Sequence, residues 1–442
     1  MSRRNGMALR LIAASLLFTA RALAQTPTVL SDQVPTAEGL TLEETYALAA
    51  QRNPRIAAAA AVADASAARV SASGLPPDPV FQIGAMNLSL PDLDADMPSS
   101  MAPSIQLMQM VPFPGKLGLS ERIAGKTSEM ARSDAGETAW MIRADVAMAF
   151  YELYAADRQI EVMRRTLRLL EDFERVARAM YGAGTGRQSD VLRANVEIAR
   201  MEADIARMEA MRKVAAARLN GLLDRPAETP VPSPVLPAVP AAVPARDTLR
   251  SWAEETRPML EKAKTGVERA DAGVDLAKKE LWPDLALGLQ YGQRDLGMGT
   301  ERMGGAMIGF SIPIFAAGRQ LKMRDEATAM RQMAKADLAG MRASVDAEIG
   351  ELLAELERAR TLLDLYETAV IPQAESNVES SFSSYRVGSV DFMTLVDAQM
   401  TLNRYEQEHY ALLGAYGTAI SRLETAVGRE LPPTPEMLAE VR

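Results

Sequence analysis

Cysteine is absent from this chain of 442 residues, and histidine occurs only once, at His409. Without cysteine the chain can form no disulfide, no thiolate metal site, no cysteine nucleophile and no lipid-modified N-terminal cysteine. A single histidine excludes a cluster of histidine ligands, and Glu406 and Glu408 beside it are typical of a solvated helix face. A glycine-rich phosphate loop is also missing. We therefore expect no bound metal, no cofactor and no enzymatic activity.

An excess of basic charge and a long apolar run are missing as well. The formal net charge is −9, whereas the binding of nucleic acid calls for a clustered basic face. We therefore expect no nucleic-acid partner. After the N-terminus, no apolar stretch reaches the roughly 20 residues of a transmembrane helix.

Residues 1–24 have the features of a secretory signal peptide. Basic residues at Arg3, Arg4 and Arg10 precede a short apolar run, and Ala22-Leu23-Ala24 offers an A-x-A cleavage site. The apolar run has about half the length that a membrane anchor needs. We expect export through a cleavable signal.

A duplication is the most informative feature of the chain. Tyr181–Asn195 (YGAGTGRQSDVLRAN) aligns without a gap on Tyr385–Gln399 (YRVGSVDFMTLVDAQ). Solenoid units have about 20–50 residues, so two copies so far apart indicate a duplicated half-molecule. Upstream segments repeat in the same order: Asn53-Pro54 at Arg257-Pro258, Pro77-Asp78 at Pro283-Asp284, and Val111-Pro112 with Gly115-Lys116 at Ile312-Pro313 with Gly318-Arg319.

The duplication divides the mature chain into a first repeat at 25–225, a second repeat at 247–430 and a C-terminal tail at 431–442. The seven prolines of 226–246 predict a semi-rigid crossover between the repeats. A proline-rich recognition motif is the alternative interpretation of this segment.

Each repeat is expected to hold a helix, a strand pair and long helices. The strand pairs are predicted at about 79–112 and 284–314, and the long helices at 117–220 and 319–428. Apolar residues from Val345 to Tyr366 alternate at spacings of four and three, which is typical of a coiled coil. Pro372 is expected to break the second long helix.

The second strand pair alternates apolar residues with small or polar ones. Such strands fit a lipid-facing membrane barrel, or a sheet that covers a core. Because the smallest single-chain barrels use about eight strands, the lipid-facing interpretation requires strands from other chains. The alternating apolar residues are Leu285, Leu287, Leu289 and Tyr291, then Ala306, Ile308, Phe310 and Ile312.

Together these features resemble the TolC-type outer-membrane efflux proteins over residues 40–430. The motifs are VPFPGK at Val111–Lys116, its echo at Ile312–Arg319, and the Tyr-x-x-Gly turns at Tyr181 and Tyr385. The VPFPGK form, with Gly74–Pro79 before the first strand, resembles the heavy-metal branch, which handles copper and silver or divalent cations.

The resemblance implies an α+β membrane protein with an internal tandem repeat. Three chains would form a homotrimer, with a 12-stranded outer-membrane β-barrel continuous with a long periplasmic α-helical coiled-coil barrel. The trimer would be the passive channel of a tripartite efflux system, passing metal cations such as copper and silver from periplasm to exterior. Its partners would be a periplasmic membrane-fusion adaptor, an inner-membrane RND-type pump and outer-membrane lipid. A conduit for drugs or other small molecules, and a periplasmic coiled-coil adaptor or structural protein, are the alternatives.

The resemblance also implies a gate at the helix tips that contain Gly184 and Gly388. There, Tyr385 would hydrogen-bond Asp190, and Asp397 would form an acidic ring at the aperture. A second ring position holds Thr394, and the position of a second, basic tether holds Val390. The alternative is that Asp190, Asp391 and Asp397 only cap or flank helix starts. The residues expected where the strands leave the barrel are Pro112, Gly115, Lys116, Pro313, Gly318 and Arg319.

The chain contains 26 methionines. Thioethers are good ligands for Cu(I), but methionine also fills irregular gaps between helices. Packing is the favoured interpretation, including for Met86, Met108, Met110 and Met307 in the predicted strands.

Overall fold

The structure, a computed structural model, describes residues 39–87, 101–237, 243–295 and 299–432. All of them belong to one compact unit, Gly39–Arg442. The predicted signal peptide at 1–24 and most of the predicted tail at 431–442 lie outside the described residues.

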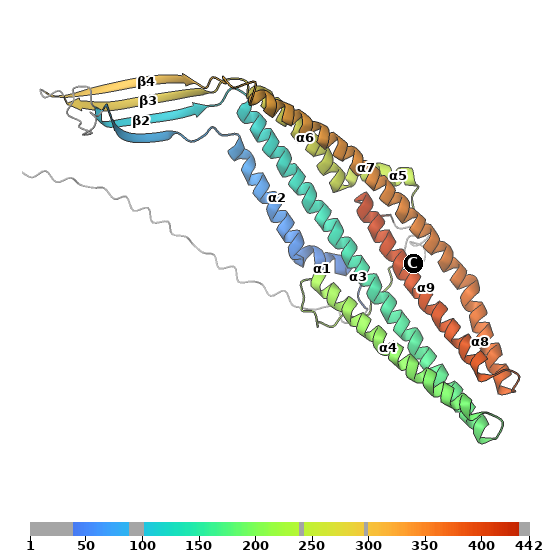
Figure 1. The fold of residues 1–442 in the computed structure, drawn as a ribbon. Coiled ribbons are helices and arrows are strands. Elements are labelled where there is room, and N and C mark those ends of the chain that lie inside the picture. Colours follow the sequence, from blue (N-terminus) through green and yellow to red (C-terminus); the bar gives the residue numbers. More distant parts are fainter. Residues whose placement is uncertain (1–38, 88–100, 238–242, 296–298, 433–442) are drawn as a thin grey trace, which may run out of the picture. The chain divides into compact units, whose positions relative to one another are not determined.

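The secondary-structure elements follow the same order twice (Figure 1). In the first series α1 (Leu42–Arg52) and α2 (Pro54–Ser73) precede β1 (Val80–Met86), β2 (Met101–Val111), α3 (Lys116–Gly182) and α4 (Gln188–Leu222). In the second, α5 (Arg246–Thr256) and α6 (Pro258–Lys279) precede β3 (Leu285–Asp295), β4 (Thr300–Phe310), α7 (Gln320–Leu365), α8 (Ile371–Arg386) and α9 (Phe392–Val427). A π-helical segment, Tyr366–Val370, joins α7 to α8.

Proline separates the two short helices of each series. Asn53 ends α1 and caps α2, where its side chain accepts a hydrogen bond of 2.9 Å from the amide of Arg55. Pro54 is the first residue of α2, and Pro258 is the first residue of α6. Because proline lacks an N–H, it can begin a helix but cannot continue one.

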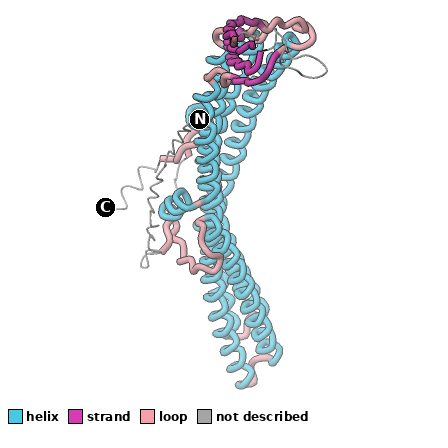
Figure 2. The backbone as a smooth tube through the Cα atoms, turned by 90° about the vertical axis from the view of Figure 1, so that its left-hand side faces the viewer, coloured by secondary structure: helices cyan, strands magenta, loops and turns pink. Residues whose placement is uncertain are grey.

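The helix α3 has 67 residues, which corresponds to about 100 Å at about 1.5 Å per residue. It packs against α2, α4, α6 and α9, and α7 packs against α6 and α9. Figure 2 shows these helices lying alongside one another. Because most helical stability in proteins comes from packing, we attribute the stability of α3 mainly to the apolar residues that it buries between helices.

The coiled-coil stripe predicted in the second repeat is buried in α7 from Val345 to Ala359, whereas Leu363 is partly buried and Tyr366 lies in the π-helical segment. Val345, Ile349, Leu352 and Leu356 form one core cluster with residues of α5 and α9. The break expected at Pro372 is the π-helical segment just before it, where the Ile371 amide bonds back to the Tyr366 carbonyl. Proline has no amide to offer this ladder, so a wider turn accommodates it.

The four strands of the described residues form one antiparallel sheet in the order β1-β2-β3-β4. Phe81 lies opposite Leu107, Leu107 opposite Leu289, and Leu287 opposite Ile308. All these side chains are exposed on one face of the sheet, as the alternating pattern predicts. The predicted alternation extends to Ile312, but β4 ends at Phe310, which lies opposite Leu285, the first residue of its partner strand β3.

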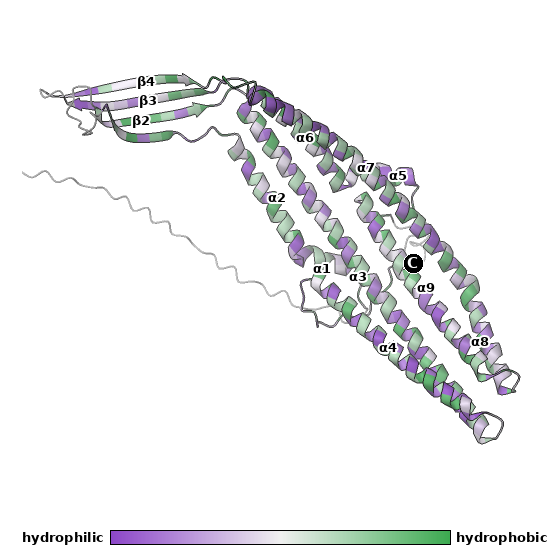
Figure 3. Ribbon diagram, viewed as in Figure 1, coloured by the Kyte–Doolittle hydropathy of each residue, from purple (hydrophilic) through white to green (hydrophobic). Residues whose placement is uncertain are grey.

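Hydrophobic and hydrophilic residues are interspersed along the long helices (Figure 3). Among the described residues, none of the helices is both long enough and apolar enough to cross a membrane.

Residues 226–237 of the predicted crossover at 226–246 contact the first repeat, whereas Val243 packs against the core cluster of the second repeat. The Leu40 amide donates to the Ser233 carbonyl at 3.1 Å, and the Val235 amide donates to the Leu40 carbonyl at 2.9 Å. Val231 is buried in the core cluster shared with α3 and α4. These contacts hold the segment beside the start of α1.

Candidate functional site at the helix tips and strand exits

Two turns join the long helices and are called the tips below: residues 183–187 between α3 and α4, and residues 387–391 between α8 and α9. In each, a glycine has a left-handed backbone, with φ of 75° at Gly184 and 74° at Gly388. A Cβ atom added to either glycine would meet no atom within 4 Å. The backbone angle, and not lack of space, therefore favours glycine at both tips.

The two tips close with matching hydrogen bonds. Gly184 donates to the Tyr181 carbonyl at 3.0 Å, and Gly388 donates to the Tyr385 carbonyl at 2.9 Å. The next amides, Thr185 and Ser389, each bond at 2.9 Å to a carbonyl one residue further upstream. The sequence repeat at the tips is thus a repeat of backbone geometry.

Tyr385 on α8 and Asp190 in the first turn of α4 lie near each other. The tyrosine is 3% exposed, and its ring packs edge-on against Phe392 with centroids 5.4 Å apart. Burial, and then the negative charge of Asp190, raise the pKa of Tyr385 to about 12. The hydroxyl makes no hydrogen bond of standard geometry. The hydrogen bond between these two side chains therefore stays a prediction.

The acidic residues at the start of α9 have different surroundings. Asp391 caps the helix, accepting hydrogen bonds from the amide of Thr394 at 2.9 Å and from its hydroxyl at 2.7 Å. These bonds lower the pKa of the Asp391 carboxyl. Capping, which was one interpretation of the tip aspartates, therefore holds for Asp391.

Asp397 lies one turn beyond Thr394, and both side chains are exposed on the same face of α9. Within the described residues the Asp397 carboxylate has no ion pair and no side-chain hydrogen bond. Its charge is therefore available to whatever occupies the space in front of this face.

Two basic residues near the tips, Arg187 and Arg193, belong to no motif of the sequence. The positive charges of Arg193 and Arg187 contribute to the lowered pKa of Asp391. Arg187 immediately precedes α4 and Arg193 lies in its second turn. The tandem repeat gave no signal for them, because the matching positions hold Asp391 and Asp397.

At the first strand exit, residues 112–116, a buried lysine joins the two repeats. Lys116 is 5% exposed, and its Nζ atom lies 2.8 Å from Oδ1 of Asp284 and 3.3 Å from Oε2 of Glu280. Burial raises the pKa of Asp284, but the hydrogen bonds from Lys116 and from the Phe113 amide outweigh it and hold the pKa below its ordinary value.

The other residues of this exit surround the ion pair. Gly115 has φ of 89°, and a Cβ atom there would come 3.0 Å from the Lys279 ammonium. That ammonium donates to the Pro114 carbonyl at 3.1 Å. Phe113, after Pro112, stacks on Trp282 with ring centroids 5.2 Å apart.

The second strand exit, residues 311–319, has the repeated sequence but different surroundings. Arg319, the counterpart of Lys116, is exposed and makes no ion pair with any described residue. Gly318 does not have the left-handed backbone of Gly115. Around Pro313, the side chains of Ile312, Ile314 and Phe315 are 74%, 78% and 75% exposed. In a single chain, this exit is therefore open where the first is closed.

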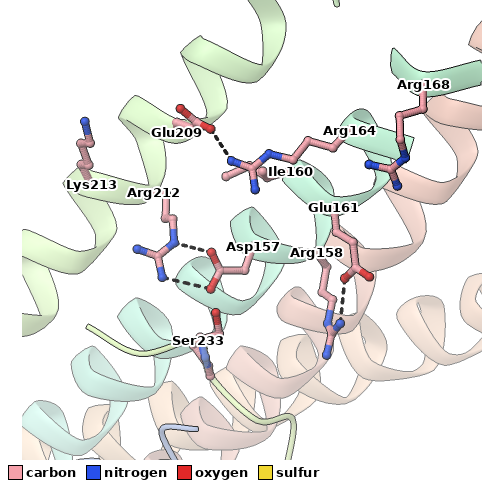
Figure 4. A pocket seen from close by; sticks show the side chains of 11 residues that line it. Asp157, Arg158, Ile160, Glu161, Arg164, Arg168, Glu209, Arg212, Lys213 and Ser233 are labelled. Atoms are coloured by element: carbon pink, nitrogen blue, oxygen red, sulfur yellow. Dashed lines mark hydrogen bonds and ion pairs between the residues drawn. The ribbon is translucent and has the colours of Figure 1, made fainter. Parts of the chain in front are cut away.

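A polar hollow of about 540 Å³ lies between α3 and α4 (Figure 4). Arg212 pairs with Asp157, and Arg164 lies 2.6 Å from Glu209. Both ion pairs connect the two helices. The hollow contains none of the predicted site residues.

No group of three or more histidine, cysteine, aspartate or glutamate side chains in the described part of the chain could hold a metal ion. His409 is 2.9 Å from Glu367 and joins α9 to the π-helical segment.

The doubled series of short helices, strand pair and long helices, closed by matching glycine turns, defines a TolC-like chain. The model of the outer membrane efflux protein family matches residues 45–225 and 249–429. The chain belongs to the outer membrane efflux protein family. Family membership confirms the prediction that the chain is a transport protein and not an enzyme. It also rejects the alternative that the chain is a periplasmic adaptor.

Individual proteins agree with this assignment. The chain is 24% identical over 395 residues to the cobalt-zinc-cadmium resistance protein CzcC of Cupriavidus metallidurans, with 88% of this chain and 90% of CzcC covered. The solved outer-membrane channel OprN superposes with a TM-score of 0.76 at 19% identity, over 88% of this chain and 89% of OprN. CusC, solved in a study of transmembrane channel formation, has a TM-score of 0.75 at 16% identity, over 88% of this chain and 92% of CusC. These likenesses confirm the TolC-like fold.

Proposed function

We propose that this chain forms the outer-membrane channel of a tripartite efflux system and passes metal cations from the periplasm to the exterior. The observation that carries the choice of cargo is the similarity to a cobalt-zinc-cadmium resistance protein across 88% of this chain. The channel is passive. Its energy comes from an inner-membrane RND-type pump, coupled through a periplasmic membrane-fusion adaptor.

A homotrimer is the assembly that the sheet supports. One face of the sheet exposes large apolar side chains, among them Ile83, Leu289 and Ile308. Within the described residues β1 and β4 are edge strands, and exposed edges with an apolar face invite pairing with further strands. Three copies would contribute twelve strands to one closed sheet, with the apolar face toward outer-membrane lipid.

The tips form the periplasmic gate in this proposal. Gly184 and Gly388 shape the turns, Tyr385 donates to Asp190 in the closed state, and symmetry-related Asp397 side chains form the aperture ring together with the positions of Thr394. A ring of carboxylates favours cations in a pore. Hydrated metal cations can pass such a ring without a permanent metal site.

The division of the chain is also part of the proposal. Residues 1–24 are removed on export, residues 25–225 and 247–430 are the two repeats, and 226–246 is the crossover. N-terminal sequencing of protein purified from outer membranes should begin at Gln25. A start at Met1 would contradict cleavage.

The cargo is tested by deleting the gene and measuring growth of the host over graded concentrations of cobalt, zinc, cadmium, copper and silver salts. Loss of tolerance to one or more metals, restored by a plasmid copy, is the expected result. A panel of drugs and detergents is the matched comparison. Loss of tolerance to those compounds alone would assign the conduit to the alternative cargo.

A further inference from the structure

The two strand pairs of the chain share one register. Aligning Asp78 with Asp284 gives each residue of β1 a counterpart in β3, and aligning Pro112 with Pro313 gives each residue of β2 up to Gln109 a counterpart in β4. Every regular pair of β1 with β2 then coincides with an observed pair of β3 with β4. Val80–Met108, Phe81–Leu107, Gln82–Gln106, Ile83–Ile105 and Gly84–Ser104 become Ala286–Gly309, Leu287–Ile308, Gly288–Met307, Leu289–Ala306 and Gln290–Gly305.

The pairing of β2 with β3, which connects the two strand pairs, has no counterpart within the described sheet of one chain. Under the same alignment, its equivalent would pair β4 with β1, and these are the two edge strands of the described sheet. A second copy of the chain can supply the missing strand. The antiparallel ladder of β2 and β3 then predicts the register of β4 with β1 of that copy.

The predicted register places matching side chains opposite one another. The observed pairs Gln109–Leu287 and Leu107–Leu289 become Phe310 opposite Phe81 and Ile308 opposite Ile83. All four of the new residues are more than half exposed in the single chain. Apolar and aromatic cross-strand pairs of this kind stabilise a sheet.

On the other face, the register sets large side chains opposite glycines. The predicted pairs are Gly309 with Gln82, Met307 with Gly84, and Gly305 with Met86. A slip by one residue would move the apolar residues of one strand to the wrong face. A slip by two residues, with Phe310 opposite Ile83, would bring Met307 against Met86 and leave two glycines facing each other.

The ion pair at the first strand exit also has no equivalent at the second strand exit within one chain. Lys116 matches Arg319, and Asp284 matches Asp78. Arg319 and Asp78 are both exposed and have no ion-pair partner among the described residues. Lys116, by contrast, is buried, and its ammonium lies 2.8 Å from the half-buried Asp284 carboxylate. The exposed Ile312, Ile314 and Phe315 beside Arg319 are apolar surface that a neighbouring chain would cover.

We propose that β4 of one chain pairs antiparallel with β1 of a second copy in the register Phe310 opposite Phe81, and that Arg319 of the first chain forms a salt bridge with Asp78 of the second. This contact rests on the homotrimer proposed above and specifies how its chains join. It is the intermolecular equivalent of the joint between β2 and β3 inside each chain.

Because the chain lacks cysteine, introduced cysteine pairs report on this contact without background. The variant Phe81→Cys with Phe310→Cys, oxidised in outer membranes, should give covalent dimers and trimers on denaturing, non-reducing gels. Gln109→Cys with Leu287→Cys is the matched pair within one chain, and should oxidise to a similar extent without any increase in mass. Ile83→Cys with Phe310→Cys represents the slipped register, and should crosslink about tenfold less, since disulfides tolerate little displacement.

Charge reversal tests the salt bridge. Arg319→Asp and Asp78→Arg should each reduce the gel-resistant oligomer by about fivefold, because each leaves two like charges facing each other. The double reversal should restore most of it. Two single losses without restoration in the double variant would overturn the salt bridge.

The crosslinking outcomes separate this inference from the proposed function. Crosslinking of the slipped pair in place of Phe81 with Phe310 would overturn the register. A trimer by detergent-resolved mass that gives no crosslinked species would overturn the strand contact and leave the channel function intact. A monomer by the same measurement would contradict the homotrimer as well.

Discussion

Lys116 and Asp284 are 168 residues apart in the sequence, yet the Nζ and Oδ1 atoms of their side chains lie 2.8 Å apart. The pair joins the end of β2 in the first repeat to the beginning of β3 in the second. Since the lysine is buried, its hydrogen bonds to this partner offset the cost of removing the ammonium from water. The pair therefore fixes where the sheet meets the long helices.

Replacing Asp284 by Asn should destabilise the chain by about 2 kcal/mol, because a buried ammonium loses its nearest carboxylate and retains only Glu280 and a carbonyl. Thermal unfolding of the purified protein, followed by helical circular dichroism, measures this. The lowered pKa of Asp284 means that its stabilisation is present above the ordinary value of 3.8 and is lost as the pH falls through the lower folded value.

Lys278→Met is the matched control for Asp284→Asn. Lys278 makes an exposed ion pair with Asp275 on α6, and its loss should cost less than about 0.5 kcal/mol. If the two substitutions lower the free energy of unfolding equally, the ion pair at the strand exit stabilises the chain no more than an exposed ion pair does.

Gly388→Ala and Gly184→Ala should each destabilise the chain by about 1 kcal/mol, because alanine is strained at these positive φ angles. No atom lies close enough to clash, so Gly388→Asn should cost less, since asparagine tolerates this backbone. Gly182→Ala, at the end of α3, is the control and should be neutral or stabilising. If Gly388→Asn loses as much stability as Gly388→Ala, the positive φ angle is not the reason for glycine at this position.

Tyr385→Phe should increase the conductance of the reconstituted channel if the hydroxyl closes the tip by donating to Asp190. With a pKa of about 12, the tyrosine is neutral at pH 7 and can donate. Asp190→Asn should act in the same direction, and the double variant should add little. Tyr181→Phe, the exposed counterpart in the first repeat, is the control. Unchanged conductance in both tip variants would remove this pair from the gate.

Asp397→Asn should lower the cation selectivity of the channel, measured as the reversal potential in a salt gradient. Three symmetry-related negative charges would disappear from the aperture at once. Asp391→Asn is the matched control, because asparagine also caps helices well and the capping residue is not placed in the ring. An unaltered reversal potential in Asp397→Asn would reject the acidic ring.

Glu424→Gln should make stability less dependent on pH. Burial raises the pKa of Glu424 above its ordinary value of 4.5, and its contacts with the Leu431 amide and Arg143 offset this only in part. The stabilisation from the protonated carboxyl is therefore full below pH 4.5 and is lost as the pH rises through the higher folded value. The variant should be more stable than the parent chain at pH 8, where the parent must bury a charged carboxylate.

Glu430→Gln is the control for this prediction, because Glu430 is the more exposed partner of Arg143. It should weaken the pH dependence only slightly, because the charge of Glu430 is the smallest of the contributions to the raised pKa of Glu424. A parent chain that gains stability as the pH rises from 4.5 to 7, and a Glu424→Gln variant that loses this gain, would reverse the sign assigned to Glu424.

Much of this fold follows from local patterns. The alternation in β3 and β4, the coiled-coil stripe of α7 and the proline starts of α2 and α6 depend on neighbours in sequence, and each is visible in the residues themselves. The glycines of the tips are predictable for the same reason, since a turn between two helices needs one residue with a positive φ.

Other features depend on contacts between distant segments. The pairing of Lys116 with Asp284, and the exposure of Arg319 at the equivalent position, could not be read from two similar motifs. The influence of Arg187 and Arg193 on Asp391 has the same origin, because it depends on how near the beginning of α4 comes to the beginning of α9 in the fold. The roles of Asp190, Tyr385, Thr394 and Asp397 in a gate remain predictions.

The most direct test of the channel proposal is the conductance of the purified mature protein in planar lipid bilayers, with subunit number determined by detergent-resolved mass. We predict discrete conductance steps from a trimer, with a preference for cations. A folded trimer that inserts into the bilayer and conducts no ions, or a monomer that never enters it, would contradict the proposal.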